Sequence, residues 1–198
     1  MALSQHARDD ALKVVATPLD GAFVLTPEIH RDTRGFFLES YRRDVFAAEL
    51  GIEPVFVQDN HSRSAKYVLR GLHFQWEPPM GKLIRVTAGS AFVVAVDIRK
   101  DSPTLGQWHG LELSAENSKQ VWAPAGFARG FCALTDDTDV QYKCTASYHP
   151  GGEAGILWND PEVAIKWPVD RPVLSDKDST AQSLAHWLVR PEADAFKL

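Results

Sequence analysis

Short hydrophobic runs separated by turn residues recur along the chain from Val14 onward. The runs are rich in Val, Phe, Leu and Trp, and clusters of Gly, Pro, Asn and Asp interrupt them. Such short runs at close spacing are typical of all-β proteins. The predicted strands are residues 22–25, 35–41, 55–58, 68–74, 82–87, 91–98, 108–113, 120–122, 130–134, 140–144 and 155–158. They predict an all-β fold, either an antiparallel double-sheet jelly roll or an open barrel.

Helical patterns interrupt the strands at only two places. Asp44 can cap a helix over residues 45–50 that ends at Gly51. Ser179 can cap a second helix over residues 180–189, near the end of the chain. We therefore expect a few short helices at the periphery of the sheets, one of them C-terminal.

The first thirteen residues are polar and charged and show no hydrophobic period. A segment of this kind is typical of a loose arm or of a contact between subunits. Residues 14–198 are expected to form a single jelly-roll catalytic domain, because no repeat or linker divides them.

Composition and charge exclude several classes of protein. The chain has 198 residues, 44% of them hydrophobic, which is enough to fill one core without disulfides or a metal. A net charge of -5 without a stripe of Lys and Arg argues against nucleic acid as a partner. No apolar run approaches the roughly 20 residues that span a bilayer, and no signal peptide is visible. With only Cys132 and Cys144, we expect a cytoplasmic protein with reduced thiols.

Polar and basic side chains are dense on the middle strands. His73 and Arg70 lie on one predicted strand, Lys82 begins the next, and residues 58–62 read QDNHS. A lone histidine on a strand is more often a core or edge residue than a catalyst, but such density needs a ligand or internal partners. Strict alternation places Arg70 and His73 on opposite faces. They face one pocket only if the strand kinks, and Gly71 is where a β-bulge could form.

Two further residues are candidates for chemistry. Tyr142 shares a strand face with Val140 and Cys144, so it points inward, either as a core aromatic or as a proton donor in a cavity. Asp178 precedes the last predicted helix, where it could cap the helix or orient a histidine.

The pattern of histidines argues against a metal. Metal-dependent barrels of the cupin type present an H-x-H pair, a later Glu and a final His after a P-x-G turn, because several such ligands must converge. Here Gln75 takes the second position of the pair after His73. The turn is present at residues 124–126, but Arg129, a cation that repels a metal, stands three positions further on. We expect a barrel without a metal or any other cofactor.

These segments together resemble the dTDP-4-dehydrorhamnose 3,5-epimerase family. The match runs in family order from about residue 18 to residue 178, which makes it far more specific than one short motif. The matching segments are RGFFLESY (34–41), FVQDNHS (56–62), VLRGLHFQ (68–75), GKLIRV (81–86), VDIR (96–99), SPT (102–104) and ILWND (156–160).

The resemblance implies a metal-free, cupin-like jelly roll, usually a homodimer, that inverts C3 and C5 of a dTDP-4-keto-6-deoxyhexose without a cofactor. By similarity, His73 is the general base, Asp178 orients it, and Tyr142 is the acid on the other face of the sugar ring. Lys82 is implied at the C4 oxygen, where a cation stabilises an enolate. The further substrate-binding positions implied by similarity are Arg34, Glu39, Gln58, Asp59, Asn60, Arg70, Arg129, Glu153 and Lys177.

One position departs from the family pattern. Relatives usually have histidine where this chain has Arg129, and arginine is larger, permanently charged and offers a fixed fork of donors. It either binds the diphosphate more strongly or changes which sugar or carbon is processed. Three alternatives stay open: an epimerase of C3 or C5 alone, a sugar-nucleotide-binding barrel without catalysis, and a metal-dependent cupin oxygenase or isomerase.

Overall fold

A computed structural model describes residues 12–198. The expected N-terminal arm, residues 1–13, lies outside the described residues except for Leu12 and Lys13, which begin the first strand. No helix within the described part of the chain is long and apolar enough to cross a membrane.

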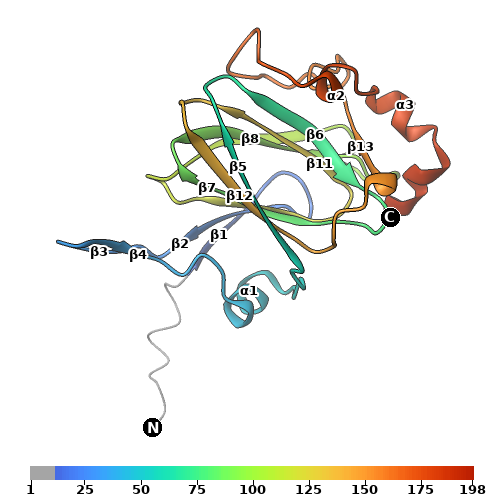
Figure 1. The fold of residues 1–198 in the computed structure, drawn as a ribbon. Helices are drawn as coiled ribbons and strands as arrows, with labels where there is room; N and C mark the ends of the chain where they lie inside the picture. The colour runs from blue at the N-terminus through green and yellow to red at the C-terminus, as the bar shows by residue number, and fades with distance from the viewer. Residues whose placement is uncertain (1–11) are drawn as a thin grey trace.

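Two antiparallel sheets face each other and form the body of the molecule (Figure 1). The six-stranded sheet has the order β1 (Leu12–Ala16), β2 (Phe23–Pro27), β10 (Gln120–Ala123), β7 (Lys82–Ala88), β12 (Thr138–Cys144), β5 (Gln58–Ser64). The five-stranded sheet has the order β13 (Glu153–Gly155), β6 (Leu69–Gln75), β11 (Phe127–Ala133), β8 (Ser90–Asp97), β9 (Trp108–Ser114). The predicted antiparallel double-sheet jelly roll is confirmed.

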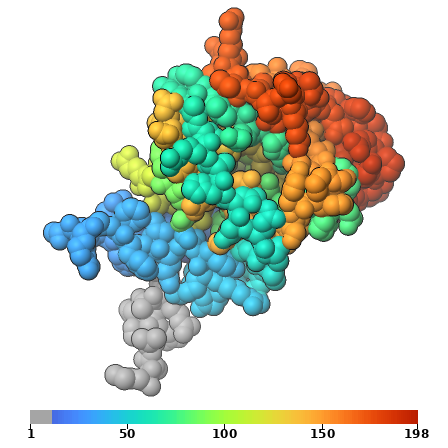
Figure 2. All heavy atoms as spheres, in the orientation of Figure 1, coloured from blue at the N-terminus to red at the C-terminus, as the bar shows by residue number. Residues whose placement is uncertain are grey.

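A separate hairpin of β3 (His30–Asp32) and β4 (Gly35–Phe37) projects from this body (Figure 1, Figure 2). Two of its aromatic side chains are largely exposed, Phe36 at 59% and Phe37 at 65%. The predicted strand over residues 35–41 is therefore only a short arm of this hairpin.

The edge strand β5 was misplaced by the hydrophobic pattern, which predicted a strand at residues 55–58. The observed strand begins at Gln58 and is polar throughout, with alternate residues exposed. It pairs along its length with β12, from Cys144 opposite Gln58 to Thr138 opposite Ser64. An edge strand with few hydrophobic residues carries little signal in the sequence.

The helices are short and peripheral. They are α1 (Arg43–Leu50), α2 (Asp176–Ser179) and α3 (Leu184–Leu188), with 3₁₀ turns at Pro150–Gly152 and Pro191–Phe196. The first ends at Gly51 as predicted, but it begins after Arg42 without a side-chain cap, and Asp44 lies in its first turn.

The prediction of one C-terminal helix over residues 180–189 was wrong. Ser183, not Ser179, caps α3 by accepting a hydrogen bond from the His186 N–H. The segment between α2 and α3 instead forms a β-bridge in which Gln182 lies beside Ile156. Pairing with the barrel outweighs helix propensity there, because it satisfies backbone groups beside the buried Ile156.

The core lies between the sheets and continues on their outer faces. Between them, Ile84, Val86 and Val140 of the six-stranded sheet pack against Val93 and Phe131 of the other. The helix α1 packs on part of the outer face of the six-stranded sheet, where its Phe46 joins Leu25, Leu83 and Trp122. The C-terminal segment covers the outer face of the five-stranded sheet, where the rings of Phe74 and Trp187 lie 4.5 Å apart.

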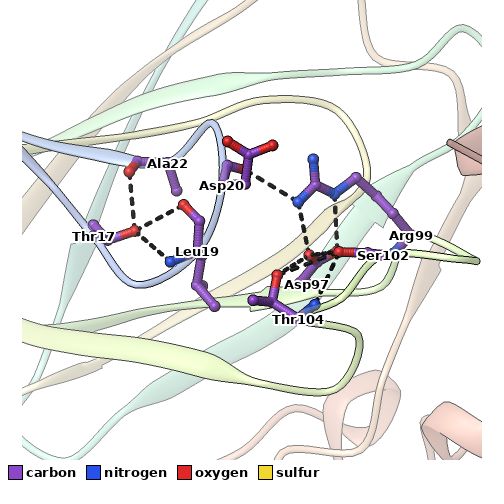
Figure 3. A network of polar contacts seen from close by, with 8 residues as sticks. All are labelled: Thr17, Leu19, Asp20, Ala22, Asp97, Arg99, Ser102 and Thr104. Atoms are coloured by element: carbon purple, nitrogen blue, oxygen red, sulfur yellow. Dashed lines mark hydrogen bonds and ion pairs between the residues drawn. The ribbon is translucent and has the colours of Figure 1, made fainter.

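A buried ionic network secures the loop after β8 (Figure 3). The Asp97 carboxylate accepts two hydrogen bonds from the Arg99 side chain, and also one each from the Ser102 and Thr104 hydroxyls at 2.6 Å. Arg99 additionally donates to the backbone carbonyl of Asp20, which joins the loop between β1 and β2 to this network. The Arg99 backbone N–H donates to Oδ1 as well, so both oxygens of this fully buried carboxylate accept hydrogen bonds, two at Oδ1 and three at Oδ2.

Asp97→Ala is expected to lower the free energy of unfolding by about 3–5 kcal/mol, because it leaves the buried Arg99 guanidinium without its anion. Urea unfolding followed by circular dichroism measures the effect. Asp20→Ala is the matched control, since Asp20 is exposed and contributes only its backbone carbonyl, and it should change stability by less than about 0.5 kcal/mol. Equal stability of the two variants would contradict this account of the network.

Candidate active site

A cavity of about 230 Å³ lies between the two sheets. Its lining combines apolar residues of the inter-sheet core with basic, acidic and aromatic residues from β6, β7, β11, β12 and α2. The lining residues are Ser62, Arg70, His73, Lys82, Ile84, Arg129, Gly130, Phe131, Val140, Tyr142, Ser175, Lys177 and Asp178. The structure thus brings the four predicted catalytic residues together in one cavity.

A β-bulge in β6 places Arg70 and His73 at the same cavity. Opposite β11, Arg129 pairs with His73 and Phe131 with Arg70, so β6 has one residue more than its partner over this stretch. Gly71 supplies the bend with a φ of 133°, and a Cβ there would lie 2.5 Å from the Gly130 Cα. The predicted kink at Gly71 is confirmed, and only glycine fits this position.

His73 is held by Asp178. The Nε2 atom of His73 lies 2.5 Å from the Asp178 Oδ1 atom, and the carboxylate is buried. Burial alone would raise the pKa of Asp178, but hydrogen bonds from His73, Ser175 and the Gly71 backbone bring that pKa below its ordinary value. Asp178 does not cap α2, because Ser175 caps it by accepting from the Asp178 N–H. Of the two readings of Asp178, the structure selects the orientation of a histidine.

Tyr142 and Lys82 lie on neighbouring strands, with the Lys82 Nζ 4.7 Å from the centroid of the Tyr142 ring. Burial raises the pKa of the Tyr142 phenol, which therefore keeps its proton at neutral pH. Burial, with a smaller contribution from the positive charge of Arg129, lowers the pKa of Lys82 to about 8. The cavity thus contains a protonated phenol and an ammonium group that loses its proton readily.

Arg129 lines this cavity, and its side chain is almost fully buried. One guanidinium nitrogen, Nη2, donates to the backbone carbonyls of Met80 at 2.5 Å and Pro124 at 3.0 Å. The other two nitrogens, Nε and Nη1, are buried and have no hydrogen-bond partner among the described residues. Burial lowers the pKa of Arg129 to about 10, which leaves it positively charged at neutral pH.

The predicted binding residues Glu153 and Lys177 form an ion pair beside the cavity. The Lys177 Nζ donates to the Glu153 Oε2 at 2.6 Å, and the same oxygen accepts from the Tyr148 hydroxyl at 3.0 Å. Tyr148 is a residue that sequence reasoning missed. It follows β12 in a loop without hydrophobic periodicity, where a single tyrosine carries no signal in the sequence, and in the structure its side chain is 54% exposed.

Gln58 and Asn60 connect the edge strand to this region. The Gln58 side chain donates to the Asn60 Oδ1 at 2.9 Å and accepts from the Tyr148 N–H at 2.8 Å. The Asn60 amide in turn lies 3.9 Å from the sulfur of Cys144, on the face of β12 that carries Tyr142.

Three predicted binding residues lie away from this cavity within the chain. Arg34 is exposed in the projecting hairpin and pairs with Asp32. Glu39 pairs with Arg42 at 3.0 Å, beside α1. Asp59 pairs with Lys143 at 3.0 Å and lines a different pocket, on the other face of β12.

The geometry suits acid–base chemistry on a small anionic ligand. A histidine oriented by a carboxylate can accept a proton, a phenol can donate one, and an adjacent cation can stabilise negative charge that develops between them. Among residues 12–198, no three His, Cys, Asp or Glu side chains are grouped so that they could hold a metal ion.

Comparisons with known proteins agree with this chemistry. The sequence profile of the family described as dTDP-4-dehydrorhamnose 3,5-epimerase matches residues 16–186. The dTDP-4-dehydrorhamnose 3,5-epimerase of Shigella flexneri is 50% identical over 172 residues, which cover 86% of this chain and 95% of that protein.

A solved structure and a more distant relative extend the comparison. The structure is a dTDP-6-deoxy-D-glucose-3,5-epimerase from Legionella pneumophila in complex with dTDP-4-keto-L-rhamnose. It has a TM-score of 0.88 and 48% identity, covering 92% of this chain and 96% of that chain. A dTDP-4-dehydrorhamnose 3-epimerase of Streptomyces niveus is 39% identical over 168 residues, which cover 84% of this chain and 81% of that protein.

Lys82 is expected to react with an amine-directed acylating reagent with a pH midpoint of about 8, because its pKa is lowered to that value. Mass spectrometry of the labelled peptides measures the rate at each pH. Lys177 is the control: burial alone would lower its pKa, but the ion pair with Glu153 raises that pKa above its ordinary value. A Lys82 midpoint above about pH 10, the range of an ordinary lysine, would contradict the geometry described.

Proposed function

The chain belongs to the dTDP-4-dehydrorhamnose 3,5-epimerase family, and from this premise we propose how its own residues carry out the reaction. The enzyme is an isomerase that inverts C3 and C5 of dTDP-4-dehydro-6-deoxy-D-glucose and gives dTDP-4-dehydro-L-rhamnose. The observation that carries the assignment of roles is the His73–Asp178 contact of 2.5 Å in the cavity that also contains Tyr142 and Lys82.

His73 removes the proton from the carbon next to the C4 ketone. The electron pair of the broken C–H bond moves into the ring, and the C4 oxygen becomes an enolate oxygen. Lys82 stabilises that charge, which lowers the barrier to removal of a proton from carbon. Tyr142 then donates its proton to the opposite face of the same carbon, which inverts it. Once His73 has released the proton that it took and the Tyr142 phenolate has regained one, both by exchange with solvent, the same steps invert the second carbon.

Asp178 acts on His73 and not on the substrate. As an acceptor at Nε2, it fixes which ring nitrogen carries the proton and leaves Nδ1 as the base. When His73 becomes an imidazolium, the buried carboxylate stabilises the new positive charge, as a carboxylate does for the histidine of serine hydrolases. The low pKa of Asp178 keeps it ionised for this role.

The remaining cations bind the substrate's diphosphate and nucleoside. Arg70 and Lys177 line the cavity from opposite elements, and Arg70 is only lightly committed, with single bonds to the Ser64 hydroxyl and the Arg63 carbonyl. The side chains of Gln58, Asn60 and Glu153 offer further polar groups at the edge of the cavity. Guanidinium and ammonium groups are the usual ligands of phosphate oxygens in proteins.

The alternatives are less well supported. The single-carbon relative is 39% identical, against 50% for the double epimerase of Shigella flexneri. A barrel that only binds sugar nucleotides does not need an oriented histidine and a buried phenol in the same cavity. A metal-dependent cupin needs a ligand cluster, and none is present among the described residues.

We further propose that the enzyme is a cytoplasmic homodimer with shared sites. Arg34, Glu39 and Asp59 carry substrate-binding roles by resemblance but lie outside their own chain's cavity. The β3–β4 hairpin projects from the body (Figure 1), and its Phe36 and Phe37 side chains are exposed. An exposed aromatic hairpin next to an arginine is suited to insertion into a second copy, where Arg34 reaches the nucleotide.

Incubation with dTDP-4-keto-6-deoxyglucose in D2O with a chelator should place deuterium at both C3 and C5, as measured by mass and NMR.

His73→Asn should lower turnover by about 100- to 10,000-fold, since it removes a positioned base. Tyr142→Phe should impair inversion while exchange at carbon persists. Full activity of the His73 variant would refute the base, and deuterium at one carbon only would select the single-carbon alternative.

Mixed dimers of Arg34→Ala and His73→Asn should be active although each variant alone is not. With shared sites, a mixed dimer has one intact site, so co-expression at equal amounts should restore about a quarter of wild-type activity. A mixture of Asp178→Asn with His73→Asn is the control, because both residues belong to the same chain's cavity and no intact site can form. No restoration in the first mixture would show that the hairpin does not serve the partner.

A further inference from the structure

Arg129 is a buried cation without an anion. Only 4% of its surface is exposed, and none of the ion pairs within residues 12–198 includes it. Its two hydrogen-bonded carbonyls, of Met80 and Pro124, tie one end of the guanidinium to the turns before β7 and after β10. The Nε and Nη1 atoms are buried too and have no hydrogen-bond partner among the described residues, although Arg129 borders the cavity.

A buried charge of this kind acts on its neighbours through its field. In a medium of low polarity the effect of a charge on a group several ångströms away is much larger than in water. The neighbour that matters is Lys82, the first residue of β7, which stands two positions after Met80 in the sequence. Lys82 also has no ion-pair partner in the described part of the chain. Arg129 pairs with His73 in the sheet, and Arg129, His73 and Lys82 all line the same cavity.

Among the other groups that face Lys82, the negative charge of Glu153 raises the Lys82 pKa and the positive charge of Lys177 lowers it, so these two act in opposite directions. The β12 residues Tyr142 and Cys144 are neutral at pH 7, because burial raises the pKa of both. Glu153 of β13 is committed to Lys177 of α2 and to the Tyr148 hydroxyl. The surroundings of Lys82 therefore carry an excess of positive charge in the free enzyme.

We propose that Arg129 is a positioning residue that acts through Lys82: its fixed charge makes Lys82 a proton donor to the substrate's C4 oxygen and not only a neighbouring charge. The inference rests on the proposed function, which assigns Lys82 to that oxygen. As the enolate forms, the C4 oxygen takes a proton from the Lys82 ammonium, and the nitrogen keeps the electron pair. The result is an enol and a neutral amine, and reprotonation at carbon returns the proton to Lys82.

The arrangement gives the reaction an electrostatic advantage. Two cations close together repel, so losing the Lys82 proton to the substrate relieves repulsion at the moment when the C4 oxygen becomes basic. Arginine serves here because its guanidinium keeps its charge when buried, whereas a neutral histidine in the same place exerts no such repulsion. Activity is therefore expected to fall at alkaline pH. Above the Lys82 pKa of about 8, the free enzyme has lost the proton that Lys82 must donate.

The test compares the pH midpoint of Lys82 acylation, and the alkaline limb of kcat/KM, in three variants. Arg129→Gln should raise both by about one pH unit, since it removes a like charge near Lys82. Arg129→Lys, which can restore the charge, should return both toward the wild-type values. Arg85→Gln is the matched control: Arg85 lies on the same strand as Lys82 but faces Gln141 on the other side of the sheet, so its loss should leave the midpoint in place.

Unchanged Lys82 midpoints in a folded Arg129→Gln enzyme would overturn the proposal, as would a rise in KM with both pH values in place. Arg129→His, neutral above about pH 8, replaces the glutamine variant if the latter does not fold. The acylation midpoint does not depend on turnover. It therefore measures the effect of Arg129 on the Lys82 pKa even if deuterium exchange is absent. That absence would refute the proposed function separately.

Discussion

The site depends on the close approach of two strands at Gly71 and Gly130. With no side chain on either residue, β6 can lie against β11 while holding one more residue than its partner. That extra residue reverses the alternation of β6, so Arg70 and His73, which a regular strand would separate, line one cavity. A side chain at Gly71 would meet the backbone of the neighbouring strand at 2.5 Å. The position of His73 in the cavity therefore depends on the bulge that Gly71 allows.

The exterior of the barrel positions the carboxylate inside it. The C-terminal segment packs on the outer face of the five-stranded sheet through Trp187 and Phe196, which contact Phe74 on the strand that also carries His73. Upstream of this packing, Ser175 caps the short helix that carries Lys177 and Asp178 to the cavity. Hydrophobic contacts on one face of β6 thus fix the geometry of an ionic contact at its other face.

The charge gathered at the cavity is positive, opposite in sign to the net charge of the whole chain. The protein has a net charge of -5, yet Arg70, Lys82, Arg129 and Lys177 all line one cavity. Only Lys177 among them has a carboxylate partner in the described residues. Cations gathered at one cavity without carboxylate partners are unfavourable until an anion arrives, so the same groups that weaken the empty site favour a substrate that carries a diphosphate and develops an enolate.

The sequence alone determined the class of the fold and the chemical identity of the site. Alternating short runs sufficed for the antiparallel strands of the core, because burial on one face imposes a period of two. The ordered motifs around His73 and Lys82 indicated the family, and Gly71 indicated the bulge. These are local signals, and they need no knowledge of which strands become neighbours.

Tertiary structure decided the rest. The polar edge strand β5 and the broken C-terminal helix were mispredicted, because pairing with β12 and with Ile156 outweighs their local preferences. The contact of Asp178 with His73 spans 105 residues of sequence, and only folding selects it over helix capping. The surroundings of Arg129 are decided in the same way. The effect of its charge on neighbouring groups depends on distance and burial, and both are set only when the two sheets pack together.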